Sequence, residues 1–103
     1  MNNRKKSLRQ DLLFEALLSL ETKEECQAFL EDICTIREVE SMAQRIEVAQ
    51  MLEASHTYLD IAAKTGASTA TISRVNRALN YGSEGYSRVL KKIAEKKSTG
   101  DKI

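Results

Sequence analysis

Apolar side chains recur along this chain at three- and four-residue intervals, which is the spacing of a helix with one buried face. Thr22 and Thr35 each have a glutamate three residues later, a capping-box pattern that marks the start of a helix. The 103 residues include no proline and only four glycines, a composition that favours long helices over sheets. The sequence therefore predicts an all-α fold of six helices, at about residues 7–20, 22–34, 35–54, 57–65, 69–79 and 83–97.

The stretch at residues 57–79 has the most specific local pattern. Thr57 is followed three residues later by an aspartate, so it can cap a short helix that ends at Thr65, just before Gly66. Ser68 is suited to cap the helix that follows. Two short helices joined by a glycine turn form the helix-turn-helix plan, in which the second helix enters the DNA major groove.

Spacing within this stretch supports the same interpretation. A close helix crossing needs a small residue before the turn glycine and a branched apolar residue after it, and Ala62 and Ile72 stand at those places. The outward residues combine short hydroxyls with arginines, which bond phosphates and base edges. The predicted DNA-binding residues are Ser68, Thr69, Ala70, Thr71, Ser73, Arg74 and Arg77. An ordinary helical hairpin with a polar outer face is the alternative.

The segment TGASTATISRVNRALNYGSEGY, with RIEVAQMLEAS before it, resembles the Trp repressor superfamily and within it the Trp-repressor-related YerC/YecD type. The resemblance covers roughly residues 35–93. It implies an intertwined homodimer and a wet DNA interface, in which Thr69, Ala70 and Thr71 approach base edges directly or through water. The chain departs from the Trp repressor at Leu59, where that protein has a base-contacting arginine.

A partner subunit is also expected from the first helix. Its apolar residues are too many for one face: Leu13, Leu17 and Leu20 form one stripe, while other large apolar side chains point elsewhere. A chain of this size buries only a modest core when alone. The stripes expected to be buried in the later helices are Cys26, Phe29, Leu30 and Ile33, then Ile36, Val39, Met42, Ala43, Ile46, Ala49 and Leu52, and finally Tyr86, Val89, Leu90 and Ile93.

Charge is unevenly distributed along the chain. Residues 1–54 carry seven Lys or Arg against eleven Asp or Glu, a net charge of −4, whereas residues 55–103 carry nine against four, a net charge of +5. The basic half contains the predicted helix-turn-helix, as a phosphate-binding surface requires, although a solvated basic tail explains part of the excess. Residues 1–6 are predicted to be a disordered basic arm, residues 7–97 a single domain, and residues 98–103 a frayed tail.

Other classes of function find little support in the sequence. The chain has no nucleophilic triad, P-loop, dinucleotide-binding glycine pattern or metal-ligand set, so neither an enzyme nor a cofactor or metal site is predicted. Cys26 and Cys34 are expected to be small buried hydrophobes, and His56 to have no chemical role. No segment is apolar enough to span a membrane and no leader is evident, so a cytoplasmic protein is expected.

We therefore predict a homodimeric, sequence-specific DNA-binding regulator, a repressor acting on a near-palindromic operator. The alternatives are a protein-interaction module and a tryptophan-responsive repressor. By the resemblance, the effector pocket would include Arg45 or Gln44, Arg74, Val75 and Ala78. Val75 and Ala78 replace a glycine and a serine of the Trp repressor, which crowds the site and removes a hydrogen bond, so tryptophan is not the expected effector.

Overall fold

The computed structural model describes residues 4–99, and the side chains of residues 8–98. These residues form six α-helices and no strand, which confirms the predicted fold class. The helices are α1 (Arg4–Leu18), α2 (Lys23–Ile33), α3 (Ile36–Glu53), α4 (Tyr58–Thr65), α5 (Thr69–Tyr81) and α6 (Gly85–Thr99).

Capping residues begin α2 and α3 where the sequence predicts them. Thr22 Oγ1 accepts a hydrogen bond from the Glu25 amide at 3.0 Å, and the Glu25 carboxylate accepts one from the Glu21 amide at 2.8 Å. At the next helix, Thr35 and Glu38 bond each other's amides reciprocally, at 2.8 and 3.1 Å. Each bond satisfies an amide in the first turn of a helix or just before it, where no helix carbonyl is available as a partner, so the helix starts are determined locally.

The ends of the chain differ from the prediction. Helix α1 begins at Arg4, so residues 4–6 belong to a helix and not to a disordered arm. Lys and Arg are good helix formers and no breaker precedes Ser7, so the helix can extend toward the N-terminus. Helix α6 likewise continues to Thr99, two residues into the predicted frayed tail. Residues 1–3 of the arm and 100–103 of the tail lie outside the described residues.

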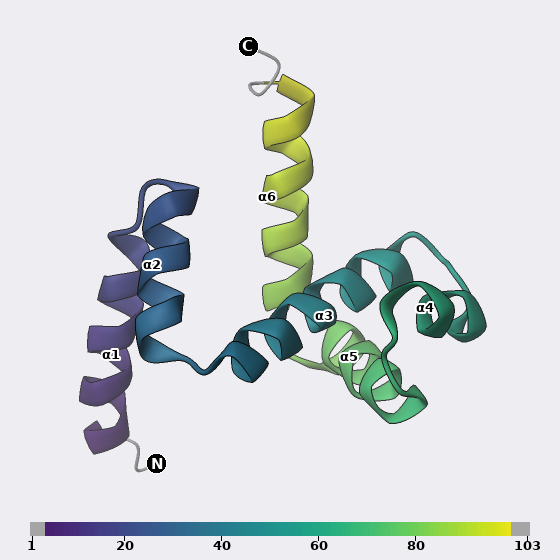
Figure 1. Ribbon diagram of the computed structural model, residues 1–103, viewed down its shortest axis with the longest axis horizontal. Helices are drawn as coiled ribbons and strands as arrows, with labels where there is room; N and C mark the ends of the chain where they lie inside the picture. Colours follow the sequence, from purple (N-terminus) through teal and green to yellow (C-terminus); the bar gives the residue numbers. More distant parts are fainter. Residues whose placement is uncertain (1–3, 100–103) are drawn as a thin grey trace. The chain divides into compact units, whose positions relative to one another are not determined.

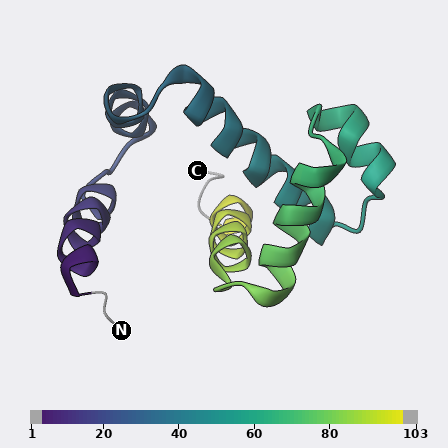
Figure 2. The same cartoon turned by 90° about the horizontal axis from the view of Figure 1, so that it is seen from below.

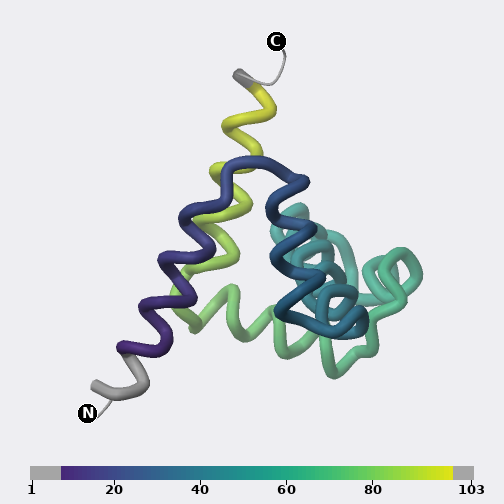
Figure 3. Tube along the Cα trace, turned by 60° about the vertical axis from the view of Figure 1, so that its left-hand side comes forward, coloured from purple at the N-terminus to yellow at the C-terminus, as the bar shows by residue number. Residues whose placement is uncertain are grey.

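The described residues divide into two compact units, with the boundary between Val39 and Glu40. In the first unit, α1 and α2 meet at their connecting turn and splay apart (Figure 3). None of its described side chains is buried, and Leu8, Leu12 and Leu18 are 69–84% exposed. Cys26 is a free, exposed thiol and Cys34 a free, half-buried one, so the expected burial of both is wrong for a single chain. The described apolar side chains of this unit therefore form no core of their own.

The second unit holds the core. Helices α4 and α5 pack against the C-terminal half of α3, and α6 leads away from the end of α5 (Figures 1 and 2). The buried residues are Val48, Ala49, Ile61, Ala67, Ile72, Val75 and Leu90. This core includes the predicted inward positions Ile61, Ile72 and Val75, whereas Leu79 is half-buried against it.

The predicted buried stripe of α3 is only partly correct. Ala49 is buried as expected, but Val48, which the stripe omits, is fully buried too, and Ile36 is 84% exposed. Met42 and Ile46 also keep more than a third of their surface in solvent. The reason is that the helix-turn-helix covers α3 only near its C-terminus, from a direction that a single-helix pattern does not encode. Within the described residues, Met42 and Ile46 are therefore not covered.

Helix α5 ends two residues later than predicted, at Tyr81, because Asn80 and Tyr81 fit a helix and Gly82 is the first residue that does not. The Gly82 amide bonds the Ala78 carbonyl oxygen at 2.9 Å, and a Cβ on Gly82 would lie 2.5 Å from that same oxygen. Such a contact is a clash with backbone, which cannot swing aside as a flexible side chain can. The turn between α5 and α6 therefore requires glycine at this position.

We expect Gly82→Ala to lower the free energy of unfolding by roughly 1–3 kcal/mol, the usual cost of a forced close contact. Gly85→Ala is the matched control, because a Cβ there meets nothing within 4 Å. Chemical denaturation of both variants at one protein concentration measures the difference. Equal stability of the two variants would show that the turn relaxes without cost.

Candidate nucleic-acid interface

The first half of the candidate interface, α4 and its turn, is held by local hydrogen bonds. Thr57 Oγ1 accepts from the Asp60 amide at 3.1 Å and caps the helix start. Gly66 ends the helix with φ of 75°, in the left-handed region that costs glycine little, and its amide bonds the Ala62 carbonyl at 2.9 Å. These features confirm the predicted helix boundaries.

Ser68 begins the second helix, α5. Its Oγ accepts from the Thr71 amide and donates to Thr71 Oγ1, both at 3.1 Å. The cap orders the first turn, and the neighbouring amides at this helix N-terminus favour negative charge. Thr71 Oγ1 still has its own proton to donate. The predicted cap is therefore confirmed. The Ser68 hydroxyl also bonds the hydroxyl of Thr71, a predicted base-contacting residue.

The outward face of α5 has the exposure that a contact surface needs. Thr69, Ala70 and Ser73 are exposed, whereas Thr71, expected to face outward, is half-buried. Thr71 lies one turn before Val75 in the core, which explains its partial burial. Ala70, Ser73, Arg74 and Arg77 together line one open hollow of about 340 Å³.

Arg74 and Arg77 carry the positive charge of this face. Both are exposed, and no carboxylate pairs with either in the described residues; the ion pair found there joins Arg88 to Glu84. Helix α5 itself contains no acidic residue. Leu59, in the first turn of α4, is 79% exposed. The arrangement offers two free guanidinium groups, short hydroxyls and one apolar side chain to a ligand.

The residues considered for an effector pocket have different surroundings in the described part of the chain. Arg74 belongs to the hollow on the outer face of α5, and Val75 is part of the core. Ala78 lines a different hollow, of about 410 Å³, with Ile46, Ser83, Gly85, Tyr86 and Val89. Arg45 Nε donates to the Ser41 carbonyl of its own helix at 3.4 Å. Arg74, Val75, Ala78 and Arg45 therefore lie in different environments in this chain.

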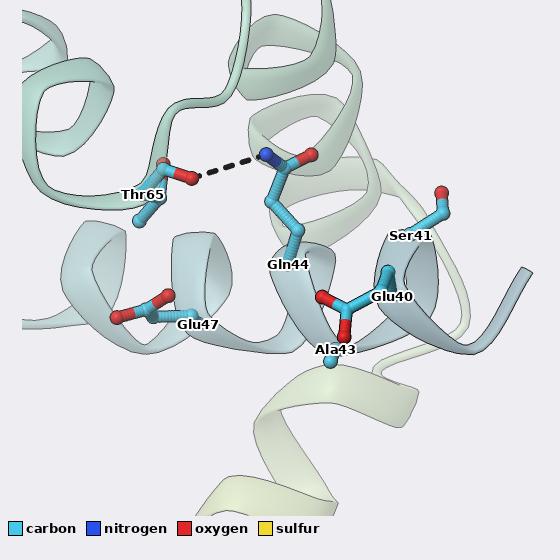
Figure 4. Close-up of a pocket in the computed structure, with 6 residues that line it drawn as sticks. All are labelled: Glu40, Ser41, Ala43, Gln44, Glu47 and Thr65. Atoms are coloured by element: carbon cyan, nitrogen blue, oxygen red, sulfur yellow. Dashed lines mark hydrogen bonds between the residues drawn. The ribbon is translucent and has the colours of Figure 1, made fainter. Parts of the chain in front are cut away.

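A further hollow, which the sequence did not predict, lies between α3 and the end of α4 (Figure 4). Its volume is about 380 Å³, and its lining residues are Glu40, Ser41, Ala43, Gln44, Glu47 and Thr65. Gln44 Nε2 donates to the Thr65 carbonyl oxygen at 3.1 Å across it. The spacing of Glu40, Gln44 and Glu47 could have placed them on one helical face. Nothing in the pattern indicates Thr65 as their neighbour.

Within residues 4–99, no three His, Cys, Asp or Glu side chains gather where they could hold a metal ion. No helix in the same range combines the length and the apolar character needed to cross a membrane. His56 is exposed.

The geometry defines an all-α protein with a helix-turn-helix whose second helix presents a cationic, hydroxyl-rich face. The model of the family described as Trp repressor protein matches residues 9–94, so the chain belongs to the Trp repressor family, a family of helical DNA-binding regulators and not of enzymes. This confirms the resemblance seen in the sequence.

Individual relatives agree with this assignment. The chain is 54% identical, over 85 residues and 82% of each sequence, to YerC of Bacillus subtilis (strain 168), a protein described as uncharacterized. A TrpR-like protein from Eubacterium eligens ATCC 27750 matches with a TM-score of 0.85 and 57% identity, over 90% of this chain and 96% of that one. A candidate Trp repressor from Staphylococcus aureus matches with a TM-score of 0.84 and 43% identity, over 91% and 95%.

Proposed function

We propose that the protein is a homodimeric transcriptional regulator, a repressor, that binds a near-palindromic DNA operator through α5. The observation that carries the proposal is the hollow of Ala70, Ser73, Arg74 and Arg77, where two exposed guanidinium groups have no carboxylate partner. Free cations beside short hydroxyls suit phosphate oxygens and base edges. Gel-shift titration on duplexes selected from a random pool tests it: retardation should weaken as salt rises, and a protein-docking module would show none.

Roles within the interface follow from position. Thr69, Ala70 and Thr71 lie in the first turn of α5, the part of a recognition helix that contacts base edges. Ser68 and Ser73 are assigned to phosphates. Thr71 suits an acceptor on a base, because its oxygen accepts from Ser68 while its own proton stays available. In the dimer, two such helices would enter successive major grooves, about one turn or ~34–36 Å apart.

Dimerisation is inferred from the apolar surface that one chain leaves uncovered. Leu12, Leu18 and Ile36 are each more than two-thirds exposed, and no described side chain before Val48 is buried. Covering a large aliphatic side chain contributes about 1.5–3 kcal/mol, so several of them together equal the stability of a small domain. A second copy of the chain supplies that cover in our proposal.

Arg77→Ala should weaken DNA binding on every sequence by roughly tenfold or more and lower the salt slope by about 1.8, because each chain of the dimer loses one phosphate contact. Lys92→Ala is the matched control, removing the same charge from the exposed face of α6. Thr71→Val should instead change the preferred sequence. An Arg77→Ala protein with unchanged affinity and slope would disprove the phosphate assignment.

Light scattering of the full-length protein should give twice the 11.6 kDa mass of one chain. Leu12→Glu should shift the mass toward the monomer, since a charge would be buried in the interface. Gln10→Glu, at an exposed polar position of the same helix, is the control and should remain a dimer. A compact wild-type monomer would contradict the proposed assembly.

Tryptophan is not the effector in our proposal. Val75 is only 2% exposed and already fills core space, and Ala78 offers no hydroxyl. Overpacking and a lost hydrogen bond cost about 1–3 kcal/mol each, so affinity should fall by orders of magnitude. Calorimetry with L-tryptophan should give no micromolar binding, and DNA titrations with and without it should coincide. A marked gain in DNA affinity with tryptophan would refute this point.

A further inference from the structure

A side-chain hydrogen bond joins the long helix α3 to the helix-turn-helix. Gln44, half-buried on α3, reaches across the hollow in Figure 4 and donates from Nε2 to the Thr65 carbonyl at 3.1 Å. The two residues are 21 positions apart in sequence. The bond therefore fixes the position of the turn relative to α3, which apolar packing, being non-directional, does less sharply.

The acceptor is a backbone group that α4 leaves unpaired. Thr65 is the last residue of α4, and the final carbonyls of a helix have no partner within it. An amide N–H is the right complement for such a carbonyl. The neighbouring carboxylates Glu40 and Glu47, when ionised, can only accept, so they cannot replace the donor. Gln44 thus supplies the hydrogen-bond donor that the Thr65 carbonyl oxygen needs.

From Thr65 the contacts continue to the start of α5. Thr65 Oγ1 donates to the Ile61 carbonyl at 2.7 Å and accepts from the Ala67 amide at 3.1 Å. Ala67 is buried, and the next residue is Ser68, the N-cap of α5. A displacement of Thr65 would therefore move the first turn of the recognition helix.

We propose that Gln44 is a positioning residue for DNA recognition: its bond to Thr65 holds α5 in its binding orientation by means of the chain itself, without a small-molecule ligand. The inference rests on the proposed function, since α5 must be the DNA-reading helix. Gln44 contacts the turn and not the DNA, so it acts through the placement of α5. Glu40 and Glu47 at the same hollow would also repel an anionic ligand.

Hydrogen exchange of the full-length protein tests the positioning without DNA. Gln44→Leu keeps the side-chain size and removes the donor, so the amides of Gly66 and Ala67 should exchange about three- to tenfold faster, the effect of one hydrogen bond. The amide of Val48 reports on the buried part of α3 and should change by less than about twofold. Gln50→Leu is the control, because Gln50 is an exposed residue of α3. Gln44→Lys restores a donor and should recover most of the protection.

DNA titration supplies the second readout, on a duplex selected by the wild-type protein. Gln44→Leu should weaken binding about three- to tenfold with an unchanged salt slope, because no phosphate contact is lost. Wild-type exchange rates in Gln44→Leu, or faster exchange that Gln44→Lys does not correct, would overturn the inference. So would altered exchange with unaltered DNA affinity. A wild-type protein that binds no DNA would instead overturn the proposed function, and the exchange data would still report on the hydrogen bond.

Discussion

The apolar contact among α3, α4 and α5 is the interaction on which the rest of this structure depends. Ile61 and Ile72 come from the two helices of the helix-turn-helix and meet Val48 of α3, and all three are fully buried. Interiors pack at close to crystal density, so branched side chains of this kind leave α4 and α5 few alternative crossings. Because that crossing is determined inside the molecule, the outer face of α5 is free to carry polar groups.

Polar groups and glycines position α4 and α5 more precisely than the apolar core does alone. Caps at Thr57 and Ser68 define where α4 and α5 start, and Gly66 and Gly82 define where they end. Each acts through a backbone group that a helix end leaves unpaired, or through a place that a Cβ cannot enter. The Gln44–Thr65 hydrogen bond adds direction where packing alone supplies only proximity. The proposed DNA-binding surface thus also depends on Thr57, Gly66 and Gln44, which are not among the proposed DNA contacts.

The two units differ in how much of their apolar surface a single chain buries. Residues 40–99 form a compact unit with a buried core. In contrast, no described side chain of α1 or α2 is buried, although Leu12 and Leu18 are large and apolar. The proposed homodimer of this helical DNA-binding family would explain the difference, because the second chain would cover the exposed leucines. The same partner chain would then stabilise the fold by covering the leucines and supply the second recognition helix.

The sequence by itself determined the features whose causes are local. Capping residues, the turn glycine and helical periodicity place α2 and α4 within a residue of their predicted bounds and identify Ile61, Ile72 and Val75 as core. Tertiary structure decided the features that depend on which face another helix covers. Val48 is buried, whereas Met42 and Ile46 each keep more than a third of their surface in solvent, because the helix-turn-helix packs near one end of α3. Periodicity carries no information about how far a neighbouring helix extends. The Gln44–Thr65 contact was invisible for the same reason, since two residues 21 positions apart become neighbours only when α4 folds back onto α3.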